Sequence, residues 1–72
     1  MSQPEMKVGP YGQKRWYLHG NLHREDGPAI EFPSGEKRWF LNDEEVGWEQ
    51  VFHQAKTPEI ELRILTAALT NA

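Results

Sequence analysis

An internal repeat is the feature of this sequence that most restricts its fold. Residues 10–20 and 33–43 align at an offset of 23 residues, and six of their eleven positions are identical. The shared residues are Pro, Gly, Lys, Arg, Trp and Leu, while Tyr17 and Phe40 form a conservative pair. Self-similarity at a fixed spacing indicates one supersecondary unit used more than once. We therefore expect two related units of about 23 residues.

Each copy is typical of a turn followed by a β-strand. A Pro-x-Gly turn opens each copy, a strand pattern follows at residues 13–18 and 36–41, and turn residues come next. Residues 29–32 should form another strand that pairs with 36–41 across the Pro-Ser-Gly turn. Met6 and Val8 fit a short edge strand. The repeats thus predict an antiparallel β-meander of about four strands.

The last third of the chain changes from strand to helix periodicity. Trp48, Val51, Phe52 and Ala55 recur at spacings of three and four residues. Thr57-Pro58-Glu59 is a helix start, with Thr as N-cap and Pro at the first helical position. We expect two short helices, at about 47–56 and 58–70, on one face of the sheet. The fold class is then α+β, a single domain over residues 1–72, with hairpin repeats at 10–46 and a helical tail at 47–72.

Composition excludes several function classes. The chain of 72 residues has no cysteine, which rules out disulfides and thiolate zinc sites. A net charge of −3 disfavours strong non-specific binding to nucleic acid. No apolar run approaches the length of a membrane span, and the first ten residues lack a signal-peptide pattern. We expect a cytoplasmic protein without a membrane partner. Because so small a domain has a thin core, we also expect either self-association or completion of the core by a partner.

Residues 17–29 suggest a family. The run Tyr-Leu-His-Gly-Asn-Leu-His-Arg-Glu-Asp-Gly-Pro-Ala resembles a repeat of the form aromatic-Leu-Asn-Gly-x-x-His-Arg-x-Asp-Gly-Pro-Ala. That repeat occurs in uncharacterised proteins of bacteriophages, prophages and large DNA viruses, and it is similar to MORN-type and antitoxin-associated β-hairpin repeats. The resemblance covers residues 11–46. The resemblance implies a β-meander and a virus-linked source. A viral protein of this kind would be located in the cytoplasm of the host cell. The resemblance implies no known chemistry.

The second copy departs from this family pattern. Asp43 replaces Gly20, and the His-Arg-x-Asp-Gly-Pro-Ala run is missing. Residues 44–49 follow instead, and we expect the chain to leave the sheet there, as a terminal copy should.

His19, His23 and Asp26 are the sharpest chemical candidates. Two histidines and a carboxylate within eight residues could hold a metal or serve a metal-dependent hydrolase. The alternative is a structural turn in which Asp26 accepts backbone hydrogen bonds and the neighbouring His and Arg connect strands. The repeat favours the turn, because Asn42 takes the place of His19 in the second copy and a metal ligand would be lost there.

The two Lys-Arg-Trp-aromatic-Leu strands provide the other candidate. Side chains alternate between the faces of a strand. We expect the Trp and Leu side chains to face the helices and form the core, namely Trp16, Leu18, Trp39 and Leu41 against Val51, Phe52, Ile64 and Leu65. The opposite face would then present Arg15, Tyr17, Arg38 and Phe40.

Arginine and aromatic side chains on one surface are typical of protein-binding hot spots and of sites for single-stranded nucleic acid. The same residues would also serve as ordinary cross-strand pairs that stabilise a sheet. The acidic net charge favours a protein partner. We therefore predict a non-enzymatic protein-binding module, encoded by a virus or mobile element, that acts on a host protein as an inhibitor or an adaptor. It should need no cofactor. A nucleotide or single-strand binder that uses the same face is the alternative, and a metal-dependent hydrolase comes third.

Overall fold

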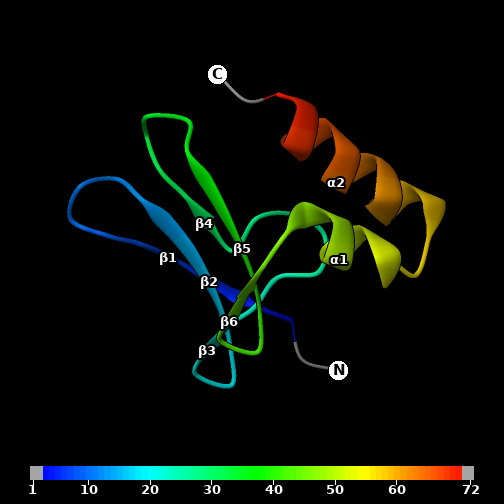
Figure 1. Cartoon of the computed structure of the whole chain (residues 1–72). Coiled ribbons are helices and arrows are strands. Elements are labelled where there is room, and N and C mark those ends of the chain that lie inside the picture. Colours follow the sequence, from blue (N-terminus) through cyan, green and yellow to red (C-terminus); the bar gives the residue numbers. More distant parts are fainter. Residues whose placement is uncertain (1–2, 71–72) are drawn as a thin grey trace.

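The structure is a computed structural model that describes residues 3–70. A sheet of six short strands is followed by two helices (Figure 1). The strands are β1 (Glu5–Val8), β2 (Lys14–Leu18), β3 (Asn21–Leu22), β4 (Ile30–Glu31), β5 (Lys37–Leu41) and β6 (Glu44–Val46). The helices are α1 (Trp48–His53) and α2 (Pro58–Leu69). The α+β class is as predicted, but the sheet has more strands than the four expected.

The sheet is antiparallel, in the order β1-β2-β4-β5-β6, and β3 pairs with β2 on the same side as β4. β3 and β4 thus lie end to end along one edge of β2. Between them, the Trp16 N–H donates to the Ala29 carbonyl at 2.9 Å, and the Trp16 carbonyl accepts from the His23 N–H at 3.0 Å. Residues 23–28 therefore form a loop, here called the motif loop, which leaves the sheet after β3 and rejoins it at Ala29, beside Trp16.

The sequence repeat is a repeat of three strands. At the offset of 23 residues, β2 corresponds to β5 and β3 begins where β6 begins, while β1 and β4 both precede a Pro-x-Gly turn. The expected pairing of 29–32 with 36–41 is present, since Ile30 lies opposite Arg38 and Glu31 opposite Lys37. The expected edge strand at Met6 and Val8 is β1, which pairs with β2.

Equivalent two-residue turns connect β2 to β3 in the first copy and β5 to β6 in the second. His19 and Gly20 have φ values of 53° and 82°, and Asn42 and Asp43 have values of 52° and 70°. Two consecutive positive φ angles define a type I′ turn, which matches the twist of the strands on either side. His, Asn and Asp enter this left-handed region more readily than other non-glycine residues. This explains why His19 and Asn42 exchange between the copies.

The expectation that the chain leaves the sheet after the second turn is wrong. β6 continues the sheet, with Val46 opposite Trp39 and Glu44 opposite Leu41. The type I′ turn forces the chain back along β5, and the helical segment begins only after Gly47.

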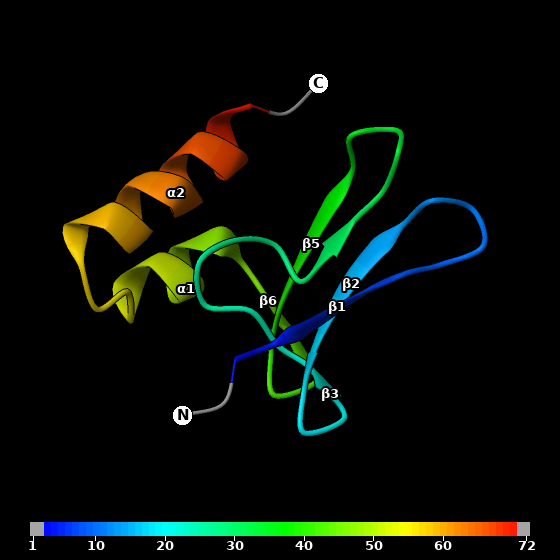
Figure 2. The same cartoon turned by 180° about the vertical axis from the view of Figure 1, so that it is seen from behind.

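Both helices lie on one side of the sheet, as predicted, where they pack against β5 and β6 and leave the β1–β2 hairpin uncovered (Figures 1 and 2). The Thr57 hydroxyl caps α2 by accepting the Ile60 N–H at 3.1 Å, and Pro58 occupies the first turn. α1 is shorter than the expected 47–56, since it begins at Trp48 and ends at His53. Within residues 3–70, no helix has the length and apolar character needed to cross a bilayer.

The core is smaller than predicted. Trp39, Val51 and Ile64 are its buried members, and Leu41 and Phe52 pack against them. These contacts confirm that the Trp39 face of β5 meets the helices. Trp16, Leu18 and Leu65 lie outside this cluster and are only partly buried, which corrects the expectation for those residues. Trp16 is covered by the Arg24 side chain of the motif loop instead, at 3.8 Å from the guanidinium carbon to the ring centroid.

Candidate protein-binding face

The predicted residues Arg15, Tyr17, Arg38 and Phe40 share one face of the sheet. Arg15 lies opposite Ile30 on β4, and Ile30 lies opposite Arg38 on β5, so these three side chains form a row across the sheet. Tyr17 and Phe40 stand two residues along from the two arginines on the same strands. Because Trp39 and Leu41 meet the helices, this second face, here called the open face, is the one that neither helix covers (Figure 2).

The two arginines of the open face differ in their surroundings. Arg38 is about half exposed, and its guanidinium lies 3.5 Å from Glu36 and 3.6 Å from Glu45. Arg15 makes no ion pair with any of residues 3–70, and its side chain is partly buried beside Ile30. The row therefore has an apolar centre, Ile30, which is 7% exposed, between two cationic groups.

Three further residues of the open face are not apparent from the repeat alone. Glu5 and Leu22 both lie opposite Tyr17, from β1 and β3, and the Lys7 ammonium lies 5.8 Å from the Tyr17 ring centroid. The sequence indicates the strand at β1, but only the register places Glu5 and Lys7 beside Tyr17. The Tyr17 ring thus lies beside the charged side chains of Glu5 and Lys7.

The charges of the open face are balanced. Its cations are Lys7, Arg15 and Arg38, and its anions are Glu5, Glu36 and Glu45. A surface that follows a phosphate backbone needs an excess of positive charge. This face instead combines balanced charge with arginine and aromatic side chains, which are the residue types enriched in protein-protein interfaces.

His23 has a structural role in the motif loop. Its side chain is buried, its Nδ1 accepts the Asn42 backbone N–H at 3.0 Å, and its Nε2 lies 3.1 Å from Glu25. The imidazole therefore connects the segment after β3 to the turn between β5 and β6. His19 is exposed in its own turn, and Asp26 binds Arg24. Within residues 3–70, no three His, Asp or Glu side chains form a group that could hold a metal ion.

Arg24 organises the rest of the motif loop. Its guanidinium stacks on Trp16 and donates to Asp26 at 2.9 Å, to the Pro28 carbonyl at 3.1 Å and to Glu31 at 3.0 Å. A Cβ atom at Gly27 would lie 2.9 Å from the guanidinium carbon, so a side chain there would displace the Arg24 guanidinium from its present position. Arg24, Asp26, Gly27 and Pro28 of the family-like motif thus hold the loop against Trp16.

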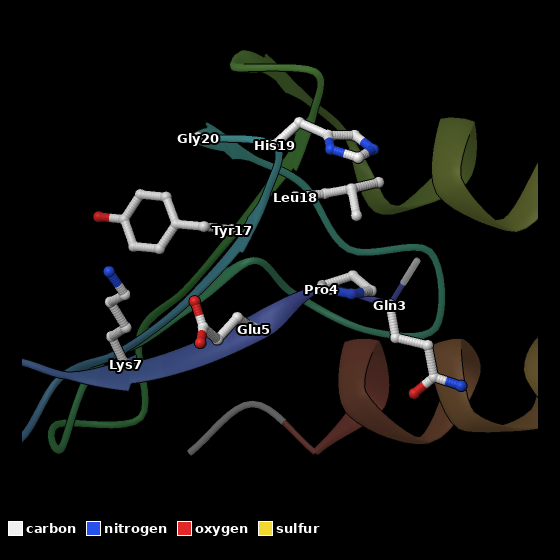
Figure 3. A pocket seen from close by; sticks show the side chains of 8 residues that line it. All are labelled: Gln3, Pro4, Glu5, Lys7, Tyr17, Leu18, His19 and Gly20. Carbon is white, nitrogen blue, oxygen red and sulfur yellow. The ribbon is translucent and has the colours of Figure 1, made fainter. Parts of the chain in front are cut away.

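An open hollow of about 790 Å³ lies at the start of β1 and around the end of β2. Figure 3 shows that its side chains do not converge, because Lys7 and Tyr17 point to one side of the strands and Leu18 and His19 point to the other. The hollow is open and follows the edge of the sheet. Its geometry does not resemble an enclosed site for a small molecule.

Comparisons with known proteins give no relative for this chain: no family model matches it, and neither a curated protein nor a solved structure does.

Proposed function

We propose that this chain is a non-enzymatic protein-binding module whose open face contacts a partner. The observation on which this rests is the row Arg15-Ile30-Arg38, flanked by Tyr17 and Phe40, on a face that neither helix covers. Arginine and aromatic side chains beside an apolar centre are the groups that most often dominate binding energy. The resemblance of residues 17–29 to repeats of phages and large viruses supports a host protein as the partner, with the chain as inhibitor or adaptor.

The partner surface should combine an apolar patch with a carboxylate. The partly exposed rings of Tyr17 and Phe40 present apolar area beside the buried Ile30. Arg15 has no acidic group among residues 3–70 to bind. A carboxylate that reaches Arg15 would form a charge-assisted hydrogen bond in a site shielded from water by the neighbouring rings.

The test replaces both arginines of the row by acidic residues. The Arg15→Glu, Arg38→Glu variant should keep its fold, with a stability loss of about 1 kcal/mol or less, because neither guanidinium is in the core. It should lose its partner. A matched control is Lys14→Glu with Lys56→Glu, which makes the same change of net charge at two exposed residues away from the open face.

Immobilised wild type, double variant and control are incubated with bacterial lysate, and the bound proteins are quantified by mass spectrometry. We expect a set of proteins that wild type and control capture and that the double variant loses. If the folded double variant captures the same set as wild type, the open face is not the binding site. If the bound material is nucleic acid whose binding falls steeply with salt, the alternative of a single-strand binder replaces this proposal.

A further inference from the structure

The outer edge of β1 exposes backbone groups with a defined pattern. The polar backbone groups of Trp16 point toward Ala29 and His23, away from β1. Because these groups alternate along an antiparallel strand, those of Arg15 and Tyr17 face β1 and engage Lys7 and Glu5. The Gly9 N–H, which donates to the Gln13 carbonyl at 2.7 Å, follows the same alternation. The N–H and C=O groups of Met6 and Val8 therefore point outward, where no strand among residues 3–70 pairs with them.

The side chains along this edge are self-complementary. When two copies of β1 pair antiparallel about a two-fold axis at Met6, Glu5 of each copy lies opposite Lys7 of the other. Opposite charges in directly facing positions stabilise an antiparallel pair. An axis at Lys7 or at Glu5 would instead place two like charges against each other. Charge thus favours the pairing centred on Met6.

Backbone chemistry favours the same pairing. Centred on Met6, the two copies exchange both Met6 hydrogen bonds, and the Val8 N–H of each copy faces the Pro4 carbonyl of the other. Pro4 lacks an N–H and limits the pairing to this short segment.

The other face of β1 has apolar surface that such pairing would cover. Met6 is 44% exposed and Val8 is 62% exposed, both on the side of the sheet where Trp16 lies. An open depression of about 390 Å³, lined in part by Pro4, Leu18 and Ile60, lies beside the start of β1, where Val8 of the second copy would arrive. The β1–β2 turn extends away from both helices (Figures 1 and 2).

From this pattern we propose that β1 is a homodimerisation edge, on which a second copy of the chain pairs antiparallel about Met6 to form one continuous sheet. The proposal does not rest on the function assigned to the open face. It uses the edge of the sheet, and its test involves no other protein.

The decisive experiment uses charge variants in sedimentation-velocity ultracentrifugation, at protein concentrations from about 10 µM to about 1 mM, the range in which small interfaces of this kind associate. Wild type should form a concentration-dependent dimer. Glu5→Lys and Lys7→Glu each place two like-charged pairs across the axis, so each variant alone should dimerise about tenfold more weakly or worse. An equimolar mixture of the two variants restores both opposite-charge pairs and should form a heterodimer of near wild-type affinity.

A backbone variant gives an independent readout. Met6→Pro removes an N–H that only the second copy would use, so it should abolish the dimer and leave the circular-dichroism spectrum of the monomer unchanged. The Met6 amide of wild type should exchange its hydrogen more slowly as protein concentration rises. A wild type that is monomeric at about 1 mM overturns the proposal. So does a Glu5→Lys variant that dimerises as wild type does.

Discussion

Arg24 connects more parts of the molecule than any other side chain described. It stacks on Trp16, binds Asp26 and Glu31, and donates to the Pro28 carbonyl. Asp26 in turn lies 3.5 Å from Arg63 of α2, so the loop also meets the helical layer. The planar guanidinium makes this possible, since it presents several donors in one plane while its face covers an aromatic ring.

At this residue scale, Arg24→Ala should destabilise the protein by about 2–3 kcal/mol, because the Pro28 carbonyl and two carboxylates lose a charged donor and Trp16 loses its cover. Arg24→Lys is the matched control. It keeps the charge but not the stack or the planar set of donors, so most of the loss should remain. Urea unfolding followed by tryptophan fluorescence measures both values. A fully stable Arg24→Lys variant would show that charge alone matters at this residue.

At the scale of elements, the two Trp-bearing strands are equivalent in sequence but are covered differently. The helices cover Trp39 on β5, which is 8% exposed. The motif loop covers Trp16 on β2, which is partly buried. Each tryptophan is thus shielded by the segment that follows its own hairpin.

This difference predicts unequal costs for the same substitution. Trp39→Ala should cost about 3–5 kcal/mol, because it opens a cavity in a core with few buried members. Trp16→Ala should cost about 1–2 kcal/mol, since its ring is only partly buried under one side chain and Met6 opposite it is exposed. Thermal unfolding of the two variants beside wild type measures the difference. Equal losses would contradict the unequal covering.

At the scale of the whole molecule, the sheet and the helices share one core. The buried cluster takes Trp39 from β5, Val51 from α1 and Ile64 from α2. The sheet therefore has little buried apolar area of its own on that face, and short hairpins without a covering layer are marginal in water.

A chain that ends at Lys56 should consequently fail to fold, although it contains every strand. Loss of α2 removes Ile64, exposes Trp39 and removes Arg63, one of the two partners of Asp26. The matched control is full-length Leu62→Ser, which alters an α2 side chain that is 64% exposed and should keep the fold. Far-ultraviolet circular dichroism and the dispersion of amide NMR signals distinguish the outcomes. A dispersed spectrum from the shortened chain would mean that the repeats fold by themselves.

The sequence by itself determined the local units. The repeat of 23 residues, the turn residues and the Thr57-Pro58 start are local signals, because each depends on backbone preferences of a few adjacent residues. The alternation along β2 and β5 likewise placed Arg15, Tyr17, Arg38 and Phe40 on one face before any partner strand was known.

Only the tertiary structure decided how these units meet. Strand register placed Ile30 between the two arginines and Glu5 and Lys7 beside Tyr17, and no local signal specifies which residues lie opposite each other across long loops. The unequal covering of Trp16 and Trp39 also arose there, because nearly identical strand sequences cannot show which of them a distant helix will bury. Burial is a property of packing between segments, so it is fixed only when the whole chain has folded.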